Sequence, residues 1–282
     1  MRARSVPPDP GPRHARRSRD PEPCADGLRV TYVRTCTIIL QHGPRTLVTD
    51  PWFSMRMRFL PALRRPGVRL ESVPPPDVVL LSHLHADHFE PRAVRSLCSD
   101  GTLVVGPVGT ASRLLPGTAG RVLELGDGST GTHAGIDLNA WRLEHTYPPP
   151  DELGYRVTMG PFSVFFAGDA AWGPQYAAIS ASGPVDVALL PVGGSLILGR
   201  RTVMSPGQAL DAGTALGARF VVPTHPGWDW LPMPPLSFHP GTAAAAERLA
   251  RRRNLSLEVV RLKPGQTACF AKNPDGETVR SR

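Results

Sequence analysis

The most constraining feature of this chain is a short run of potential metal ligands that follows an apolar strand sequence. The segment DVVLL leads directly into residues 82–88, which read SHLHADH. Because alternate side chains of an extended backbone share a face, His83 and His85 can approach one ion. The turn that follows can bring Asp87 and His88 to a neighbouring point. The spacing therefore predicts ligands for two adjacent metal ions.

The chemistry of these side chains favours a catalytic centre. Imidazole and carboxylate groups suit borderline divalent ions such as zinc, and the run contains no cysteine that would indicate a structural thiolate site. The alternative is a solvated polar turn that matches the motif by chance. Placement at a strand end is what the metal interpretation requires, so we expect a metal site. Zinc is the first choice, with manganese or iron as alternatives.

The H-x-H-x-D-H run resembles the motif of the metallo-β-lactamase superfamily, and three further candidates follow in the order of that family. His145 follows the alternating strand predicted over residues 136–144, Asp169 ends FFAGD, and His225 ends PTH. The FAGD segment resembles the bridging-aspartate motif of the superfamily. His133 is the competing third ligand, but it precedes the strand that His145 follows, and we therefore favour His145.

The resemblance implies a complete ligand set and a fold. One ion would be held by His83, His85 and His145, the other by Asp87, His88 and His225, and Asp169 would bridge both. The implied fold is of the α/β (α+β) type, a four-layer αββα sandwich with the metals in a cleft at one edge. Two cations on the order of 3.5–4 Å apart acidify a shared water, so a bridging hydroxide is the expected nucleophile. Asp87 resembles the family aspartate that also accepts a proton from the reaction.

Three segments resemble one branch of the superfamily, which includes the ascorbate-phosphate lactonases and the N-acyl-phosphatidylethanolamine phospholipases. They are TDPWF at 49–53, MSPGQAL at 204–210 and PTH before the next turn. The resemblance implies cleavage of an ester-type bond, a phosphodiester or a lactone, in a small or lipid-like substrate. Two departures stand out: YVRTCT at 32–37 replaces the frequent Y-x-G-H-x-T, and Ala170 replaces a more usual hydroxyl residue. The substrate therefore cannot be inferred from the sequence.

Several residues near these motifs have two interpretations each. Asp50 either orients a ligating histidine or caps a turn before proline, and Asp169 could instead cap a helix over 174–181. Residues 54–76 form either a flap over the site or a surface insertion. Arg200 and Arg201 are candidate anchors for an anionic substrate or solvated surface residues. A Pro-rich apolar loop either walls the pocket or packs ordinarily, and it contains Trp228, Trp230, Leu231, Met233, Phe238 and His239, the last expected to be a hydrogen-bonded surface histidine.

Composition bounds the domain organisation and the partners. Residues 1–27 are rich in Pro and Arg and poor in large apolar side chains, which predicts a disordered basic tail. A single hydrolase domain is expected over 28–272, followed by a polar, frayed tail over 273–282. The net charge of +8 comes from separate clusters rather than one stripe, so no specific nucleic-acid partner is predicted. We expect a small-molecule or lipid-like substrate, and we make no prediction of the oligomeric state.

The cysteine pattern and the N-terminus bear on location. Cys24, Cys36, Cys98 and Cys269 lack C-x-x-C spacing, and we interpret them as free thiols in a reducing compartment. The N-terminal segment has charge but no apolar core of a signal peptide, and no run reaches the apolar length of a transmembrane helix. The cytoplasm is therefore the expected location.

The pattern along the chain predicts alternating strands and helices. A first strand is expected over 28–40, a turn over 41–44 and a second strand from Thr46 to Thr49. Helices are predicted from Pro91 to Leu97, over 110–115, after the Ser205 N-cap, and over 242–253. Further strands are predicted over residues 103–106, 121–125, 155–160, 162–167, 185–190, 218–222, 255–260 and 267–270.

Two other classes of function remain open. A relative that binds metal without turnover would act as a binding protein, although the intact ligand set argues against it. A nuclease that uses residues 1–27 would cleave nucleic acid in a salt-sensitive manner, but only the charge supports it. The sequence therefore predicts a metal-dependent hydrolase.

Overall fold

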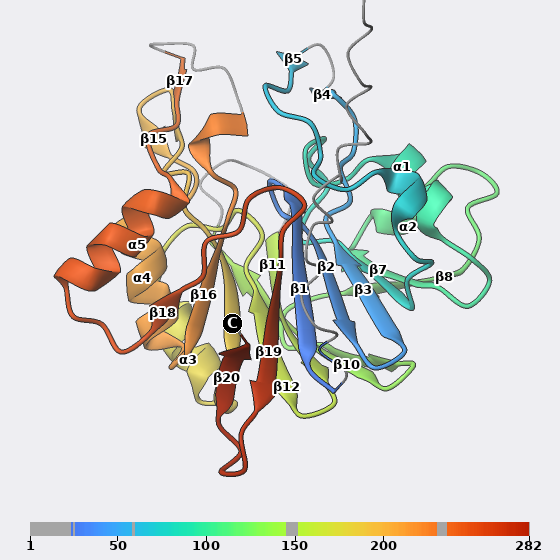
Figure 1. Cartoon of the computed structure of the whole chain (residues 1–282). Helices are drawn as coiled ribbons and strands as arrows, with labels where there is room; N and C mark the ends of the chain where they lie inside the picture. Colours follow the sequence, from blue (N-terminus) through green and yellow to red (C-terminus); the bar gives the residue numbers. More distant parts are fainter. Residues whose placement is uncertain (1–23, 25, 58–59, 145–151, 230–235, 282) are drawn as a thin grey trace, which may run out of the picture.

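Two large β-sheets form the centre of the molecule (Figure 1). The computed structural model describes residues 24, 26–57, 60–144, 152–229 and 236–281. The first sheet has the strand order β20-β19-β1-β2-β3-β6-β7-β8. Its strands are β1 (Leu28–Arg34), β2 (Thr37–His42), β3 (Arg45–Thr49), β6 (Val78–Leu80), β7 (Leu103–Pro107), β8 (Arg121–Leu125), β19 (Thr267–Lys272) and β20 (Thr278–Ser281).

The second sheet has the order β18-β16-β13-β12-β11-β10-β9. Its strands are β9 (Thr130–His133), β10 (Ile136–Leu143), β11 (Glu152–Met159), β12 (Phe162–Phe166), β13 (Val187–Pro191), β16 (Phe220–Thr224) and β18 (Glu258–Val259). Two small sheets are formed by β4 (Arg56–Met57) with β5 (Leu60–Pro61), and by β14 (Leu196–Ile197), β15 (Arg200–Arg201) and β17 (Ser237–Phe238).

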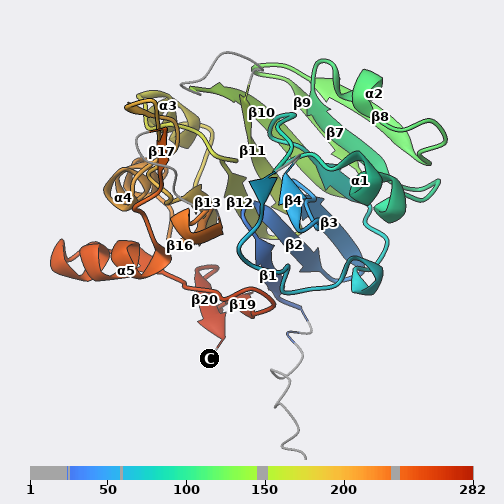
Figure 2. The ribbon, with the colours of Figure 1, turned by 90° about the horizontal axis from the view of Figure 1, so that it is seen from above.

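The helices cover the outer faces of the two sheets (Figures 1 and 2). They are α1 (Pro91–Leu97), α2 (Thr110–Arg113), α3 (Gln175–Ser180), α4 (Pro206–Ala215) and α5 (Ala243–Arg252), with short 3-10 turns η1 (Leu70–Ser72) and η2 (Gly227–Asp229). Ser205 caps α4 in a capping box with Gln208, and Pro206 occupies the first turn. Among the described residues, no helix combines the length and the apolarity needed to traverse a lipid bilayer.

Three apolar clusters define four layers. The cluster between the sheets includes Tyr32 and Leu80 from the first sheet and Tyr155 and Phe166 from the second. A second cluster joins α3, α4 and α5 to the outer face of the second sheet, and a third joins α1 to the outer face of the first. The fold is therefore an αββα sandwich, and the predicted fold class is confirmed.

The burial patterns explain why these segments form strands. The antiparallel strand β10 alternates buried and more exposed residues, because mainly one of its faces meets the core. The parallel strand β13 (VALLP) is buried along its whole length, since helices cover its other face. Strands β3, β6 and β7 of the first sheet are parallel, and so are β12, β13 and β16 of the second. Their carboxyl ends meet at the edge that is uppermost in Figure 1.

Several predicted boundaries are wrong. The segment 28–40 is two strands, because a turn at Thr35 and Cys36 separates β1 from β2 and their hairpin extends the sheet. The strand predicted over 255–260 shrinks to Glu258–Val259, the part that pairs with β16. The terminal segment 273–282 is not frayed throughout, since β20 pairs antiparallel with β19. Most of the basic segment 1–27 lies outside the described residues.

The segment predicted as a flap or insertion, residues 54–76, packs against the body of the protein. Ala62 contacts the buried Trp52 side chain, and Val73 joins the cluster beneath α1. The amide of Leu63 donates to the carbonyl of Asp229 at 3.2 Å, and the amide of Gly67 donates to that of Val33. The segment therefore lies beside the upper edge of the sandwich.

Candidate metal centre

Strand ends bring six of the seven predicted ligands to the upper edge of the sandwich. The run from His83 to His88 follows β6, Asp169 lies three residues after β12, and His225 follows β16 directly. Ligand-type atoms of His83, His88 and Asp169 lie within 4.8 Å of one another. The same is true of Asp87, His88 and His225, which is the trio predicted for one ion. His145 lies outside the described residues.

Two carboxylates stand between the imidazoles. Nε2 of His83 lies 3.6 Å from Oδ1 of Asp169, and Nε2 of His88 lies 3.6 Å from Oδ2 of the same residue. Oδ2 of Asp87 lies 3.7 Å from Nε2 of both His88 and His225. Nε2 of His225 also lies 3.9 Å from Oδ2 of Asp169. These separations are too long for hydrogen bonds.

Two buried histidine nitrogens without hydrogen-bond partners in the described residues are consistent with a bound cation. Within the described part of the chain, Nε2 of His88 and Nε2 of His225 are buried and have no hydrogen-bond partner. Such a buried polar atom costs free energy unless something binds it. Two ligands that each lie about 2.1 Å from a tetrahedral ion are about 3.4 Å apart, close to the separations here. The donor set and its spacing therefore fit a divalent cation.

Of the two described residues in the first predicted trio, His85 is the more exposed. Its Nδ1 lies 2.9 Å from Nε2 of His83, and the two rings meet edge to face. This is hydrogen-bonding distance, so binding both nitrogens to one ion requires that they give up this contact.

Asp50 binds both ends of the segment from Ser82 to His88 through its carboxylate. Its Oδ2 lies 2.7 Å from Nδ1 of His88 and accepts from the Ser82 hydroxyl at 2.6 Å, while Oδ1 accepts from the Ser82 amide at 2.7 Å. Asp50 is fully buried and has φ +36°, a strained value for a residue other than glycine. A carboxylate bound to the far nitrogen of an imidazole fixes the orientation of that ring. The orienting interpretation of Asp50 is therefore the one that the geometry supports.

Glu152 is a buried acid that the sequence analysis missed. It begins β11 with its side chain between Asp169 and His83: Oε1 accepts from the Asp169 amide at 2.7 Å and lies 3.9 Å from Nδ1 of His83. Burial raises the pKa of Glu152 well above its ordinary value, and the neighbouring Asp169 raises it further. Glu152 thus fixes the backbone of the residue predicted to bridge the ions.

Cys36 lies beneath the same cluster. Its thiol donates to the carbonyl of Gly168 at 3.2 Å, and its sulfur belongs to a group with Asp50 and His88 within 4.8 Å. Burial raises the pKa of Cys36 to about 12. The protonated thiol supports the turn that presents Asp169, and the prediction of a free thiol is confirmed.

The charges within the centre compensate one another. Burial raises the pKa of Asp87, but His88 and His225 lower it more, so the pKa of Asp87 lies well below its ordinary value. Burial lowers the pKa of His88, whereas Asp87 and Asp169 raise it to well above its ordinary value. The carboxylate of Asp87 therefore stays ionised near neutral pH.

The structure shows the surroundings of other residues that have two interpretations each. His133 contacts Arg121 and the carbonyl of Gly101, and it pairs with Ile136 at the end of β10 opposite the centre. Asp169 does not cap α3, whose N-cap is Pro174. Arg201 donates to the Gly194 carbonyl at 2.9 Å, and Arg200 is exposed.

The Pro-rich loop is described only in part. Residues 230–235, which include Trp230, Leu231 and Met233, lie outside the described residues, and so does the side chain of Trp228. Phe238 is half exposed. His239 is hydrogen-bonded to the Ser195 hydroxyl at 2.8 Å, as predicted, but it is partly buried.

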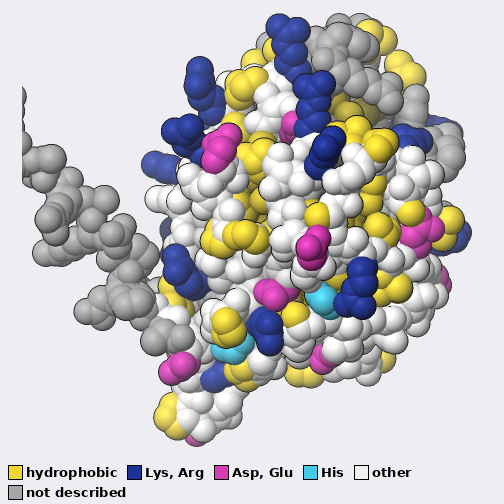
Figure 3. Space-filling view, turned by 90° about the vertical axis from the view of Figure 1, so that its right-hand side faces the viewer, with side chains coloured by type: hydrophobic (Ala, Val, Ile, Leu, Met, Phe, Trp, Pro, Cys, Tyr) yellow, Lys and Arg dark blue, Asp and Glu magenta, His cyan; other side chains and the backbone are white. Residues whose placement is uncertain are grey.

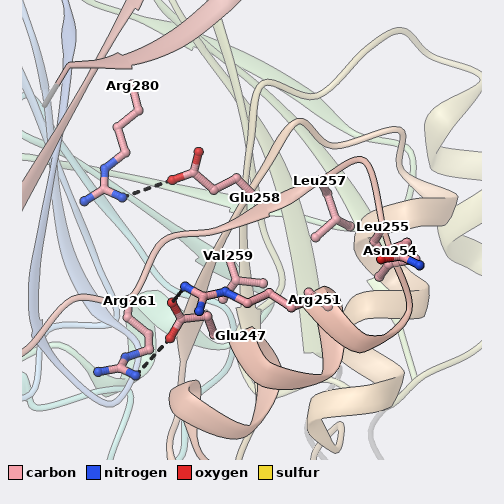
Figure 4. A pocket seen from close by; sticks show the side chains of 10 residues that line it. Glu247, Arg251, Asn254, Leu255, Leu257, Glu258, Val259, Arg261 and Arg280 are labelled. Carbon is pink, nitrogen blue, oxygen red and sulfur yellow. Dashed lines mark hydrogen bonds and ion pairs between the residues drawn. The ribbon is translucent and has the colours of Figure 1, made fainter.

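A hollow elsewhere on the surface carries a different set of charges (Figure 4). Its volume is about 730 Å³, and it lies between α5 and β18. Glu247 binds Arg251 at 2.7 Å and Arg261 at 2.9 Å, while Glu258 binds Arg280 at 3.0 Å. None of the six predicted ligands that the structure describes lines it. On the face shown in Figure 3, Lys and Arg side chains stand among acidic and apolar ones and form no continuous stripe of described residues.

Comparison with known proteins assigns the family. The profile described as "Beta-lactamase superfamily domain" matches residues 45–226, which include the histidine run, Asp169 and His225. The chain belongs to the metallo-β-lactamase superfamily. A UPF0173 metal-dependent hydrolase of Rubrobacter xylanophilus is 30% identical over 253 residues, covering 85% of this chain and 96% of the relative. One from Nitratidesulfovibrio vulgaris is 27% identical over 261 residues, covering 88% and 98%.

Several solved structures share the fold. Igni18, a metallo hydrolase of Ignicoccus hospitalis, superposes with a TM-score of 0.69 at 20% identity and covers 88% of this chain and 100% of its own. An isothiocyanate hydrolase from Delia radicum gut bacteria gives 0.67 at 16% identity, covering 85% and 98%. CmlA of Streptomyces venezuelae, a diiron β-hydroxylase, gives 0.64 at 19% identity, covering 88% and 55%. Proteins with this sandwich thus include hydrolases and a diiron β-hydroxylase.

Proposed function

We propose that this protein is a metal-dependent hydrolase with two divalent ions at the upper edge of the sandwich. One ion is assigned to His83, His85 and His145, the other to Asp87, His88 and His225, and Asp169 is shared. The observation that carries the proposal is the buried convergence of imidazole and carboxylate atoms at 3.6–3.9 Å without hydrogen bonds on Nε2 of His88 or His225. The near full-length relatives that are metal-dependent hydrolases support it.

Zinc is the proposed ion because imidazole and carboxylate suit it, and manganese or iron would fit the same donors. The diiron centre of CmlA belongs to that protein, but it makes iron worth measuring. Two such ions would lower the pKa of a shared water and stabilise negative charge on the oxygen of the bond under attack.

The side chains of this chain prepare the centre for that chemistry. Asp50 and Ser82 fix the ring of His88, and Glu152 fixes the backbone of Asp169, so neither predicted ligand has to reorganise. Asp87 stays ionised and can accept a proton on its carboxylate from the reaction and pass it to solvent. The proposed substrate has an ester-type bond, either a phosphodiester or a lactone, in a small or lipid-like molecule.

The test combines metal analysis with a substrate panel. Purified protein is expected to contain about two divalent ions per chain and to hydrolyse a member of a phosphodiester and lactone panel. A chelator is expected to abolish turnover, and zinc, manganese or iron to restore it. Bound metal without turnover on the whole panel would favour a binding protein instead. Salt-sensitive cleavage of nucleic acid that weakens when residues 1–27 are removed would favour a nuclease.

A further inference from the structure

Asp229 is a buried carboxylate that the metal ligand set does not use. It lies in η2, four residues after His225, and only 1% of its surface is exposed. Its Oδ2 accepts from the Thr35 amide at 3.2 Å and from the Thr35 hydroxyl at 3.0 Å. Both bonds join segments 194 residues apart in the chain, so Asp229 links the first hairpin of the domain to the turn after β16.

Thr35 connects Asp229 to His225, because it also bonds to the backbone of His225. It forms the turn between β1 and β2, and its carbonyl accepts from the His225 amide at 2.8 Å. Thr35 has φ +42° and His225 has φ +44°, so two residues other than glycine adopt the left-handed conformation on the two sides of one hydrogen bond. Such strained positions persist only where the surroundings over-determine them. Asp229 helps to hold this turn through the amide and the hydroxyl of Thr35.

The charge of Asp229 also has a local counterpart. Arg34 is fully buried, lies 3.6 Å over the Trp52 ring and donates to the Ser54 carbonyl at 2.8 Å. Burial lowers the pKa of Arg34, and Asp229 is the acidic neighbour that raises it most. An amide at position 229 would keep an acceptor for Thr35 but remove this compensation.

We propose that Asp229 is a positioning residue for the metal centre. By holding Thr35 through two hydrogen bonds, it fixes the backbone of His225, so that the imidazole meets Asp87 and Asp169. The inference rests on the proposed function in that His225 is taken as a metal ligand. It assigns to YVRTCT, the segment that departs from the family pattern, the role of a support for His225.

The test is a Co²⁺ titration followed by absorption, together with thermal unfolding of the metal-free protein. Asp229→Asn and Thr35→Val are expected to weaken binding of one ion by about 10–100-fold, the usual effect of losing a group that orients a ligand. Thr35→Ser keeps the hydroxyl and is expected to restore the affinity of wild type. Thr35→Val removes the hydrogen bond from the hydroxyl to Asp229 and keeps the one from the amide. This milder variant therefore tests the proposal if Asp229→Asn fails to fold.

Asp186→Asn is the matched control. Asp186 is also a mostly buried acid that accepts from a backbone amide, that of Ser163 at 2.8 Å, and it binds Lys272 at 2.8 Å. It lies before β13, at the end opposite the centre. This variant is expected to lower the unfolding temperature without changing Co²⁺ affinity.

Two results would overturn the inference: wild-type Co²⁺ affinity in both Thr35→Val and Asp229→Asn, or equal losses of affinity in Asp186→Asn and Asp229→Asn. Failure of the proposed hydrolysis can be distinguished from failure of the positioning role. If wild type binds two ions but cleaves nothing in the panel, selective loss of one ion in Asp229→Asn still supports the positioning role. A wild type that binds no Co²⁺ would overturn both.

Discussion

The metal centre and the surface hollow both gather opposite charges, but they do so in different ways. At the hollow, Glu247 touches Arg251 and Arg261 at 2.7 and 2.9 Å, and 77% of the Arg251 side chain is exposed. At the centre, His225 and Asp169 are buried, yet Nε2 of His225 and Oδ2 of Asp169 stand 3.9 Å apart. Water solvates the first kind of cluster, whereas the second kind needs a bound cation to satisfy it. Burial and spacing together, rather than the number of charges, distinguish a site from a solvated surface.

The largest expected effect comes from removing the shared carboxylate. Asp169→Ala removes the two oxygen atoms of Asp169 that face His83, His88 and His225. Metal content is expected to fall below one ion per chain, and turnover to fall by at least about 10²–10³-fold, the range for losing one electrostatic stabiliser of an active site. Elemental analysis and steady-state kinetics measure both. Asp137→Ala, which removes an exposed carboxylate from β10, is the control, and unchanged metal content in Asp169→Ala would end the assignment.

A smaller effect is expected from the support beneath the ligands. Asp50→Asn keeps the shape of the side chain but weakens its hydrogen bond to Nδ1 of His88. Metal affinity is expected to fall by about 10–100-fold, while the fold is retained. Competition with a chromophoric chelator measures this affinity. Wild-type affinity in the variant would show that Asp50 only caps the turn.

The pH dependence of the metal-free protein tests the charges of the centre. The folded pKa of His88 lies above the ordinary value of about 6.5, because Asp87 and Asp169 outweigh the effect of burial. Protonated His88 therefore stabilises the fold fully below about pH 6.5, and this contribution is lost as the pH rises through the folded pKa. Denaturant unfolding is expected to show a difference between wild type and His88→Gln that shrinks with rising pH. A difference that grows with pH would contradict this sign.

The smallest effect is expected at the hollow. Glu247→Gln breaks two ion pairs whose arginines are about half or more exposed. Such pairs contribute about 0–1 kcal/mol, so the free energy of unfolding is expected to change by less than about 1 kcal/mol. Metal content and turnover are expected to stay at the wild-type level. A loss of metal in this variant would break the contrast between the two regions.

The sequence predicted the part of the site that depends on local pattern. The run after β6, the strand end before Asp169 and the strand end before His225 are each visible as an apolar strand followed by a ligand-type residue. The boundaries of α1 and the cap of α4 followed from Pro91, Ser205 and Pro206. These features need only a few neighbouring residues to form.

The supports of the site could not be predicted in this way. Glu152 binds a residue 17 positions later, and Asp229 binds one 194 positions earlier, so neither contact leaves a local pattern. The turn at Thr35 was missed because it lacks the glycine or proline that usually marks a reversal, and β-branched residues continue on both sides of it. Tertiary contacts hold that turn in a conformation that its own sequence disfavours.

The most direct test of the central claim is a crystal structure of the metal-loaded protein with anomalous data at the zinc, iron and manganese edges. The account predicts two anomalous peaks, one beside His83 and His85 and one beside Asp87, His88 and His225, with Asp169 touching both. Such data would also place His145. A single peak, or peaks away from these side chains, would contradict the claim that this edge of the sandwich holds a pair of catalytic ions.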